Sequence, residues 1–338
     1  MKKVLFALAA VVALAACSKE ETIIADKGDA IGFDTFVENS TRSVDDKSLT
    51  KANLANFAVY GAVTNDNATA ALIFDNVEVV GSNFVENAGY STWTYQGTQY
   101  WIAGADYDFA AVAPAARGVA GAFNVTTKKT ALPFTNDGVT DLLYAQTTAE
   151  GKAQGNTAVG FSFRHILSKI KFSFKNEYLS TGSTIAVRNI KLTNAHKTAT
   201  ATLDASTVWA LGATTFEIPF GDAETVNDNN LETIAQGSEL ESYNARFIIP
   251  SANEHTYVVS FDVDIVYGST VVETYSHTAN VAFAPAAGTS YDIKTVINHT
   301  NIDPEKSQEP IEFTVTKVDE WGADNTSIEG TINPVQNN

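Results

Sequence analysis

The sequence is poor in cysteine and in positive charge, and each shortage excludes a class of function. One cysteine among 338 residues excludes an intrachain disulfide and any zinc or iron–sulfur site built from several cysteines. Lys and Arg number 22 against 39 Asp and Glu, for a formal net charge of -17, and no basic cluster occurs. Nucleic acids and anionic membrane surfaces attract clustered Lys and Arg, so neither is an expected partner.

An apolar run opens the chain, and it is too short to span a membrane. Residues 4–16 are thirteen apolar residues that follow Lys2 and Lys3, whereas a membrane helix needs about 20. A positive start, an apolar middle and small residues before a cut are typical of a secretory signal. The run ends in the lipobox Leu-Ala-Ala-Cys. We therefore expect removal of residues 1–16 and lipidation of Cys17, with an incidental cysteine after an ordinary secretory signal as the alternative.

Residues 17–29 are interpreted as a charged tether that follows the lipid anchor. Lys19, Glu20 and Glu21 resemble the signal that places some Gram-negative lipoproteins on the outer face of the outer membrane. A solvated linker is the usual explanation of such a short charged stretch. We expect a surface-exposed lipoprotein of the outer membrane.

Beyond the tether, apolar and polar residues alternate over short windows bounded by Gly, Asn, Asp and Pro, a pattern typical of β-strands. Residues 169–175 and 257–267 are clear examples. Many short strands separated by turns indicate an all-β chain of antiparallel β-sandwiches. A polar stretch at residues 147–155 is the best boundary. We therefore predict one sandwich domain over residues 30–157 and a second, with a C-terminal strand or tail, over residues 158–338.

No catalytic or cofactor-binding motif occurs in the sequence. A Gly-x-Ser-x-Gly elbow, a His-Glu-x-x-His pair, a phosphate-binding loop and a dinucleotide fingerprint are absent. The histidines are at least 22 residues apart, whereas metal sites usually bring two ligands close in sequence. We therefore predict no metal, no cofactor and no enzymatic activity. The five histidines are His165, His196, His255, His277 and His299.

Two groups of side chains have both a chemical and a structural interpretation. Asp262 and Asp264 share one face of a strand and could form a carboxylate pair, but a solvated sheet face explains them better. A group of aromatic residues could stack on sugar rings if exposed, although such residues more often pack across strands in a sandwich core. The aromatic group comprises Trp93, Tyr95, Tyr100 and Trp101.

A series of short motifs follows the lipobox along the rest of the chain. They are Tyr-Trp-Ile-Ala-Gly-Ala-Asp-Tyr-Asp-Phe at residues 100–109, Asp-Leu-Leu-Tyr-Ala at 141–145, Phe-Arg-His-Ile-Leu-Ser-Lys-Ile at 163–170, Gly-Thr-Ser-Tyr at 288–291 and the strand-like residues 311–321. Together, and over nearly the whole mature chain, they resemble the fimbrillin-like family of type V pilus subunits.

The resemblance implies a structural protein. It implies a lipoprotein precursor of two transthyretin-like β-sandwiches, from which an extracellular Arg-specific protease removes the lipidated segment and the first strand. Subunits then polymerise by strand exchange into an extracellular pilus that serves adhesion. The implied partners are other pilus subunits, the outer-membrane lipid before maturation, and receptors on host or bacterial surfaces.

The sequence contains a segment suited to be the displaced strand. Residues 30–39 alternate, so four side chains share one face and can point into a core. Loss of such a strand would leave an apolar groove with unpaired backbone groups, and a sheet edge of that kind recruits a strand from another chain. The four side chains belong to Ile31, Phe33, Thr35 and Val37.

Arg42 is the expected site of proteolytic maturation. It is the first arginine of the mature chain, it precedes Ser43, and it directly follows the candidate strand. Small polar neighbours favour an exposed, cleavable loop. An ordinary loop arginine is the alternative interpretation.

The donor strand is expected in the C-terminal region. Residues 311–318 are one candidate and the tail at residues 328–335 is the other. For residues 311–318, the alternative is an ordinary last strand of the second domain. The candidate donor side chains are Ile311, Phe313, Val315 and Val318.

A second function class stays open at this point. The chain could be a monomeric surface lipoprotein that keeps its lipid, never polymerises and binds glycan through the aromatic group between Trp93 and Trp101. Aromatic rings exposed on a shallow platform would favour that function. A removable first strand would favour the pilus subunit.

Overall fold

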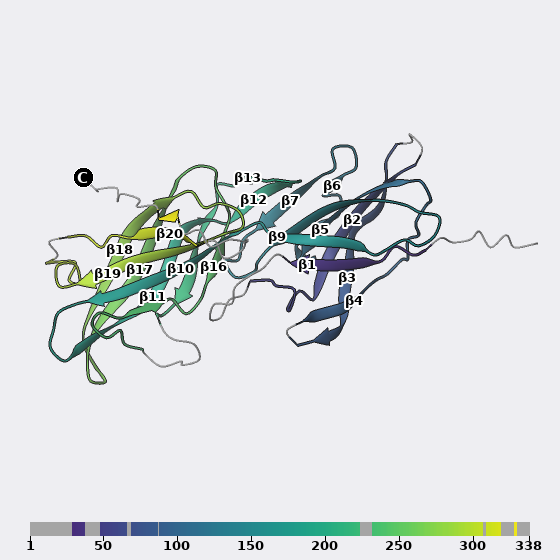
Figure 1. Cartoon of the computed structure of the whole chain (residues 1–338). Helices are drawn as coiled ribbons and strands as arrows, with labels where there is room; N and C mark the ends of the chain where they lie inside the picture. The colour runs from purple at the N-terminus through teal and green to yellow at the C-terminus, as the bar shows by residue number, and fades with distance from the viewer. Residues whose placement is uncertain are drawn as a thin grey trace, which may run out of the picture.

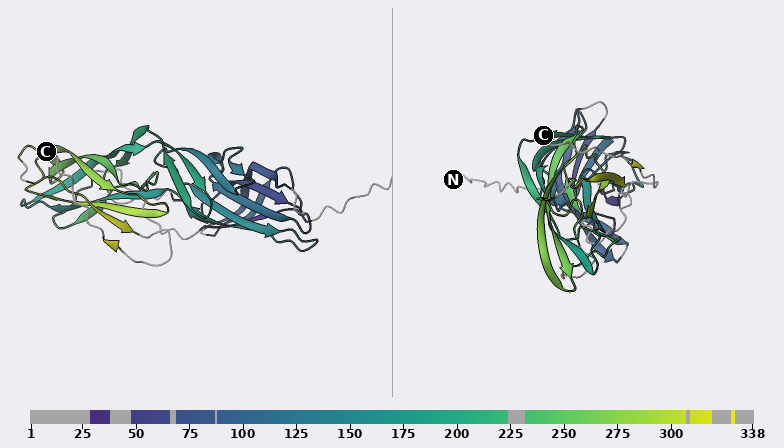
Figure 2. Two further views of the ribbon diagram at one scale, coloured as in Figure 1. Left: turned by 90° about the horizontal axis from the view of Figure 1, so that it is seen from above. Right: turned by 90° about the vertical axis from the view of Figure 1, so that its left-hand side faces the viewer.

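The computed structural model describes residues 29–37, 48–65, 69–86, 88–223, 232–306, 309–318 and 328–329, and the structural statements below concern this part of the chain. It consists of β-strands apart from one short 3₁₀ helix, η1 (Ala115–Arg117). Two lobes lie end to end in an elongated molecule (Figure 1 and Figure 2). None of the described residues forms a helix that is long and apolar enough to cross a membrane.

A seven-stranded sheet forms the body of the first lobe. Its strand order is β1-β9-β8-β5-β2-β3-β4. Neighbouring strands run antiparallel, except that β1 and β9 are parallel. The strands are β1 (Phe33–Val37), β9 (Val159–His165), β8 (Leu143–Glu150), β5 (Asp106–Ala113), β2 (Asn56–Thr64), β3 (Ala71–Val85) and β4 (Gly89–Tyr95).

The central strands of this sheet are buried on both faces. In β2, Phe57 and Val59 belong to the hydrophobic cluster that also contains β1, which we call the β1 cluster. Tyr60 and Ala62 point the other way, into a second cluster. A strand covered on both faces carries a continuous apolar run rather than an alternating one, and the sequence of β2 has this form.

The second cluster lies between the seven-stranded sheet and a four-stranded sheet in the middle of the molecule (Figure 1). This smaller sheet, in the order β13-β12-β7-β6, takes strands from distant parts of the chain. In β7 the residues Thr130, Leu132 and Phe134 are buried and their neighbours are exposed, so its sequence alternates strictly. The strands are β13 (Thr207–Leu211), β12 (Thr198–Leu203), β7 (Lys129–Thr135) and β6 (Phe123–Asn124).

Two sheets enclose a third hydrophobic cluster in the second lobe. One has the order β15-β10-β19-β20-β21, with β16 also paired to β10, and the other has the order β14-β11-β17-β18. The first contains β15 (Glu239–Glu241), β10 (Ser168–Glu177), β19 (Thr289–Asn298), β20 (Thr314–Val318), β21 (Ile328–Glu329) and β16 (Arg246–Ile248). The second contains β14 (Thr215–Gly221), β11 (Ser183–His196), β17 (His255–Tyr267) and β18 (Thr270–Phe283).

The alternation seen in the sequence places side chains in this second core. Ile170, Phe172 and Phe174 of β10 are buried in the third cluster. On the opposite face Lys171 and Lys175 are partly buried, whereas Lys169 and Ser173 are buried, so both faces of this strand are covered in part. The strand predicted over residues 257–267 is the main part of β17. The prediction of an all-β chain built of β-sandwiches is therefore confirmed.

Two details differ from the sequence expectations. The sheets are not wholly antiparallel, because β1 pairs with β9 and β10 pairs with β19 in parallel. The expected division at residues 157/158 also does not coincide with a division between sheets. The polar stretch at residues 147–155 ends β8 and leads by a turn into β9, which returns to the seven-stranded sheet. The hairpin of β12 and β13 then pairs with β7.

Candidate functional site

The strand β1 lies at the end of the seven-stranded sheet with one face buried. Ile31, Phe33, Thr35 and Val37 are each less than a tenth exposed, whereas Asp34 between them is exposed. Three of these side chains belong to the β1 cluster. The inward face predicted from the alternation of residues 30–39 is therefore present over Ile31 to Val37.

The Phe33 ring is the centre of this buried face. It stacks on Phe161 of β9, with ring centroids 5.7 Å apart and planes at 22°. It also meets Phe74 at 5.5 Å and Tyr95 at 5.4 Å, and it touches Phe57 and Phe109 edge-on. Aromatic groups in such arrangements gain energy beyond their buried area. Phe33 thus joins β1 to five rings that come from five other strands.

Backbone hydrogen bonds hold the β1 segment from two sides. On one side β1 pairs with β9 from Phe33 opposite Val159 onward. On the other side the Ile31 amide donates to the carbonyl of Gln99 over 2.9 Å. The Trp101 amide donates to the carbonyl of Asp29 over 3.0 Å. The segment therefore fills the space between β9 and residues 99–101, which follow β4 at the far end of the strand order.

Side-chain hydrogen bonds also hold the β1 segment in place. The Tyr95 hydroxyl donates a hydrogen bond of 2.9 Å to the Ile31 carbonyl and accepts one of 3.1 Å from the Gln99 amide. The Asn156 amide donates to the Asp29 carboxylate over 3.0 Å, and these Asn156 contacts lower the pKa of Asp29. The sequence did not predict the Tyr95 contact, because a tyrosine in an aromatic-rich stretch gives no sign that its hydroxyl will bind a strand backbone.

The chain is anchored again where it re-enters the first lobe. Asp141 is buried, and its carboxylate accepts hydrogen bonds of 2.8 Å from the amides of Leu49 and Leu142. Its Oδ2 atom lies 2.8 Å from Nδ1 of the buried His165. The chain from Leu49 onward is thus fixed independently of β1. Arg42, Ser43 and the lipidation residue Cys17 lie outside the described residues.

The candidate donor segment forms part of the second lobe. β20 pairs antiparallel with β19 from Val318 opposite Ser290 to Thr314 opposite Lys294. Phe313 and Val315 are buried in the third cluster, and the Phe313 ring lies 5.9 Å from that of Phe172. Ile311 and Val318 are half-buried. In this state the segment is a strand of its own second lobe.

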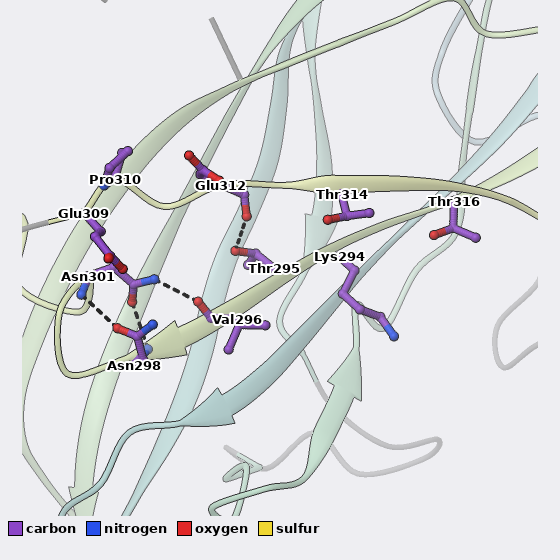
Figure 3. A pocket seen from close by; sticks show the side chains of 10 residues that line it. All are labelled: Lys294, Thr295, Val296, Asn298, Asn301, Glu309, Pro310, Glu312, Thr314 and Thr316. Atoms are coloured by element: carbon purple, nitrogen blue, oxygen red, sulfur yellow. Dashed lines mark hydrogen bonds between the residues drawn. The ribbon is translucent and has the colours of Figure 1, made fainter. Parts of the chain in front are cut away.

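A groove of about 730 Å³ borders the start of this segment, between the end of β19 and residues 309–316 (Figure 3). Figure 3 shows Thr295 donating to the Glu312 carbonyl, a hydrogen bond of 2.6 Å. At the rim, Asn301 donates to the Val296 carbonyl over 2.9 Å. The groove extends from the paired residues Lys294 and Thr314 to the residues before Thr314, which are outside the β19–β20 ladder and include Glu312, bound by the Thr295 side chain.

The aromatic group at Trp93 to Trp101 forms no exposed platform. Trp101 is buried and packs edge-on against Tyr107, with centroids 4.7 Å apart. The Trp93 ring lies 5.0 Å from Phe57, and only Tyr100 of this group has an exposed aromatic side chain, at 37%. The interpretation as core aromatics therefore holds for Trp93, Tyr95 and Trp101, which pack in or against the β1 cluster, and not for Tyr100.

The aspartate pair of β17 has a structural role that the sequence did not reveal. Asp264 is fully buried rather than solvated, and its carboxylate accepts two hydrogen bonds from Arg188, of 2.6 and 2.8 Å. Thr274 donates a third over 2.7 Å. Asp262 accepts from Asn189 and Ser276. The solvated-face interpretation is therefore wrong for Asp264, whose carboxylate contacts the side chains of Arg188 from β11 and Thr274 from β18.

Comparison with known proteins places this architecture in context. A family model described as fimbrillin-like matches residues 41–321. Among solved structures, a candidate cell adhesion protein of Bacteroides uniformis is 16% identical, with a TM-score of 0.50 over 86% of this chain and 98% of that one. One from Bacteroides ovatus is 14% identical, with a TM-score of 0.50 over 88% and 99%. These likenesses concern the fold. No curated protein matches the chain.

Proposed function

The chain belongs to the fimbrillin-like family, and from that premise we propose that it is a structural subunit of a cell-surface type V pilus. It is exported as a lipoprotein through Cys17, matured by Arg-specific proteolysis at Arg42, and assembled by strand exchange with other subunits. The assembled pilus serves adhesion.

The observation that supports strand exchange is the buried position of β1 in the first lobe. This short strand lies in the chain before Arg42, and each of its buried apolar side chains contributes about 1.5–3 kcal/mol. Removal of residues 17–42 would uncover the rings around Phe33 and free the backbone groups of Gln99, Trp101 and β9. Unpaired groups in an apolar groove are costly, so the groove would bind a replacement strand.

The candidate donor repeats the pattern of the strand it would replace. Ile311-Glu-Phe313-Thr-Val315 has the Ile-x-Phe spacing of Ile31-Gly-Phe33-Asp-Thr35, with Val315 where the first strand has Thr35. A strand from a second subunit would then bring Phe313 to the rings that Phe33 occupies. Thr35 and Val315 are both β-branched and similar in size, which suits a common pocket.

The donor would have to leave its own lobe before it could enter a neighbour's groove. That step costs the burial of Phe313 and Val315. It also breaks the five pairs with β19 from Ser290 to Lys294 and the two pairs with β21. The gain in the neighbour's groove is of the same kind. Of the two candidate donors, we propose residues 311–318 rather than the tail at residues 328–335. Within the tail the structure describes Ile328–Glu329, and these residues pair with β20.

Proteolysis of the purified mature protein tests this function. Treatment with an Arg-specific protease is expected to cut after Arg42 and to yield filaments by electron microscopy. Arg42→Ala should stay uncut at this bond and monomeric. Arg117→Ala is the matched control and should behave as wild type, because Arg117 lies in the folded first lobe beside Asp137. Wild type that stays monomeric after cleavage at Arg42 would refute the proposal.

Lipidation is tested separately in cells. Radiolabelled palmitate should be incorporated into wild type, and Cys17→Ser should abolish incorporation and release the protein from the outer membrane. Incorporation that survives the substitution would show that Cys17 is not the anchor.

A further inference from the structure

Two histidines far apart in the sequence face each other in the second lobe. His196 ends β11 and His255 begins β17. These strands run antiparallel with Thr193 opposite Val258, so three further residues along each strand bring the two histidines together. Their ring centroids lie 4.6 Å apart with planes at 44°. Their wide separation in the sequence was a reason to predict no metal site, but strand pairing brings the two side chains together.

Backbone carbonyls fix which nitrogen of each ring carries the proton. Nδ1 of His196 lies 3.3 Å from the carbonyl oxygen of Gly212. Nε2 of His255 lies 2.8 Å from the carbonyl oxygen of Asn194. A carbonyl oxygen can only accept, so these two nitrogens donate. In the neutral form of each ring, the lone pair is then on the opposite nitrogen, Nε2 of His196 and Nδ1 of His255. Metal-binding histidines are oriented by such carbonyl contacts.

The surroundings favour a neutral ring at His196 and a fixed orientation of the ring at His255. Burial lowers the pKa of His196, and the neighbouring His255 lowers it further, so the ring of His196 is neutral at pH 7. Tyr257 packs edge-on against His255 with centroids 4.6 Å apart, which restricts rotation of that ring. A neutral imidazole held in one orientation is the form that binds a metal ion.

The separation of the rings also suits a shared ion. Two imidazoles that bind one ion through nitrogens about 2.0–2.1 Å from it place their centroids about 4.5–5.5 Å apart. The observed 4.6 Å lies within this range. No group of three or more His, Cys, Asp or Glu side chains suited to a metal occurs in the described part of the chain, so the remaining positions would be taken by water.

We propose that His196 and His255 bind one divalent transition-metal ion of the kind that imidazole prefers, Zn²⁺, Ni²⁺ or Cu²⁺. The site is independent of the proposed role in a pilus. Its position gives binding a structural effect. β11 continues through Lys197 alone into β12, which pairs with β7 of the first lobe, and the ion would link β11 to β17 at this junction.

Calorimetric titration of the untagged protein with NiCl₂ tests the site. Wild type is expected to bind one ion per chain. His196→Gln and His255→Gln should each weaken binding by more than about tenfold, since each removes one of two protein ligands. His299→Gln is the control and should bind as wild type, because His299 is exposed and lies elsewhere in the second lobe. Equal binding by wild type and both substituted proteins, or no binding by wild type at millimolar Ni²⁺, would overturn the proposal.

A spectroscopic readout separates loss of a ligand from loss of the fold. Gln can keep a hydrogen bond to the backbone carbonyl, and circular dichroism should show that both substituted proteins are folded. With Cu²⁺ as the probe, electron paramagnetic resonance of wild type should show coupling to two imidazole nitrogens, and each substitution should reduce this to one. Coupling to a single nitrogen in wild type would contradict the shared site.

Discussion

Phe33 of β1 stacks on Phe161 of β9 with ring centroids 5.7 Å apart. This contact joins the strand that maturation is proposed to remove to a strand that would remain. Parallel pairing of the two strands sets Val159 opposite Phe33 and Phe161 opposite Thr35, so the two rings meet diagonally. The same contact therefore measures how tightly the first strand is seated and what a replacement strand must supply.

Truncation of Phe33 should destabilise the first lobe. Phe33→Ala is expected to lower the free energy of unfolding by about 3–5 kcal/mol, because it removes a buried ring and leaves a cavity between five others. Urea unfolding followed by tryptophan fluorescence measures the loss. Phe84→Ala is the matched control, since Phe84 is 55% exposed, and its effect should stay within about 0.5 kcal/mol. Equal effects of the two changes would mean that β1 is loosely seated.

A peptide with the sequence of the first strand should block assembly of cleaved subunits. Residues 30–37, added as a free peptide, are expected to reoccupy the groove and slow filament growth in proportion to concentration. Residues 309–318 should act in the same way if they are the donor. The control peptides carry Asp in place of Phe33 or Phe313, because a carboxylate among aromatic rings is strongly disfavoured. Inhibition by the Asp peptides as well would argue against a specific groove.

The ion pair of Arg188 and Asp264 should respond unequally to loss of its two partners. Asp264 is fully buried, whereas the Arg188 side chain is 34% exposed. Arg188→Met leaves a buried carboxylate that still accepts a hydrogen bond from the Thr274 hydroxyl, and the expected cost is about 3–5 kcal/mol. Asp264→Asn leaves an arginine that can reach water, so its cost should be smaller. Chemical denaturation measures both, and the reverse order would contradict the burial argument.

Stability should fall in mild acid because of His277. Burial lowers the pKa of this histidine below its ordinary 6.5, so the folded protein binds fewer protons than the unfolded chain below that pH. The contribution of the neutral His277 ring to the free energy of unfolding is fully present above pH 6.5. It is lost as the pH falls toward the folded-state pKa of this histidine. His277→Gln should reduce the slope of unfolding free energy against pH in this range. His299→Gln is the control, and an unchanged slope in His277→Gln would disprove the assignment.

Local patterns in the sequence predicted local structure, and contacts between distant segments lay beyond them. The alternation around Phe33 and around Phe172 placed both side chains inward, and both are buried. The parallel pairing of β1 with β9 depends on which edge the first lobe leaves open, and no local pattern records that. Alternation also separates the two faces of a strand without saying whether the polar face is covered, so the burial of Asp264 was missed.

The candidate site divides in the same way. The four inward residues of β1 were identified from their spacing, but their hydrogen-bond partners, Tyr95 and residues 99–101, were not. These hydrogen bonds involve a tyrosine hydroxyl and backbone groups, which carry no sequence signature. His196 and His255 escaped notice because strand pairing, rather than chain proximity, unites them.

Photo-crosslinking from the groove tests the central claim most directly. Tyr95, whose ring lies 5.4 Å from that of Phe33, is replaced by benzoylphenylalanine in protein that is then cleaved after Arg42, assembled and irradiated. Mixing ¹⁵N-labelled with unlabelled subunits identifies crosslinks between chains by mass spectrometry. Strand exchange predicts that the crosslinked peptide contains residues 311–318 of a different subunit. A crosslink to residues 29–37 in the assembled filaments would contradict it, because the first strand would still occupy its groove.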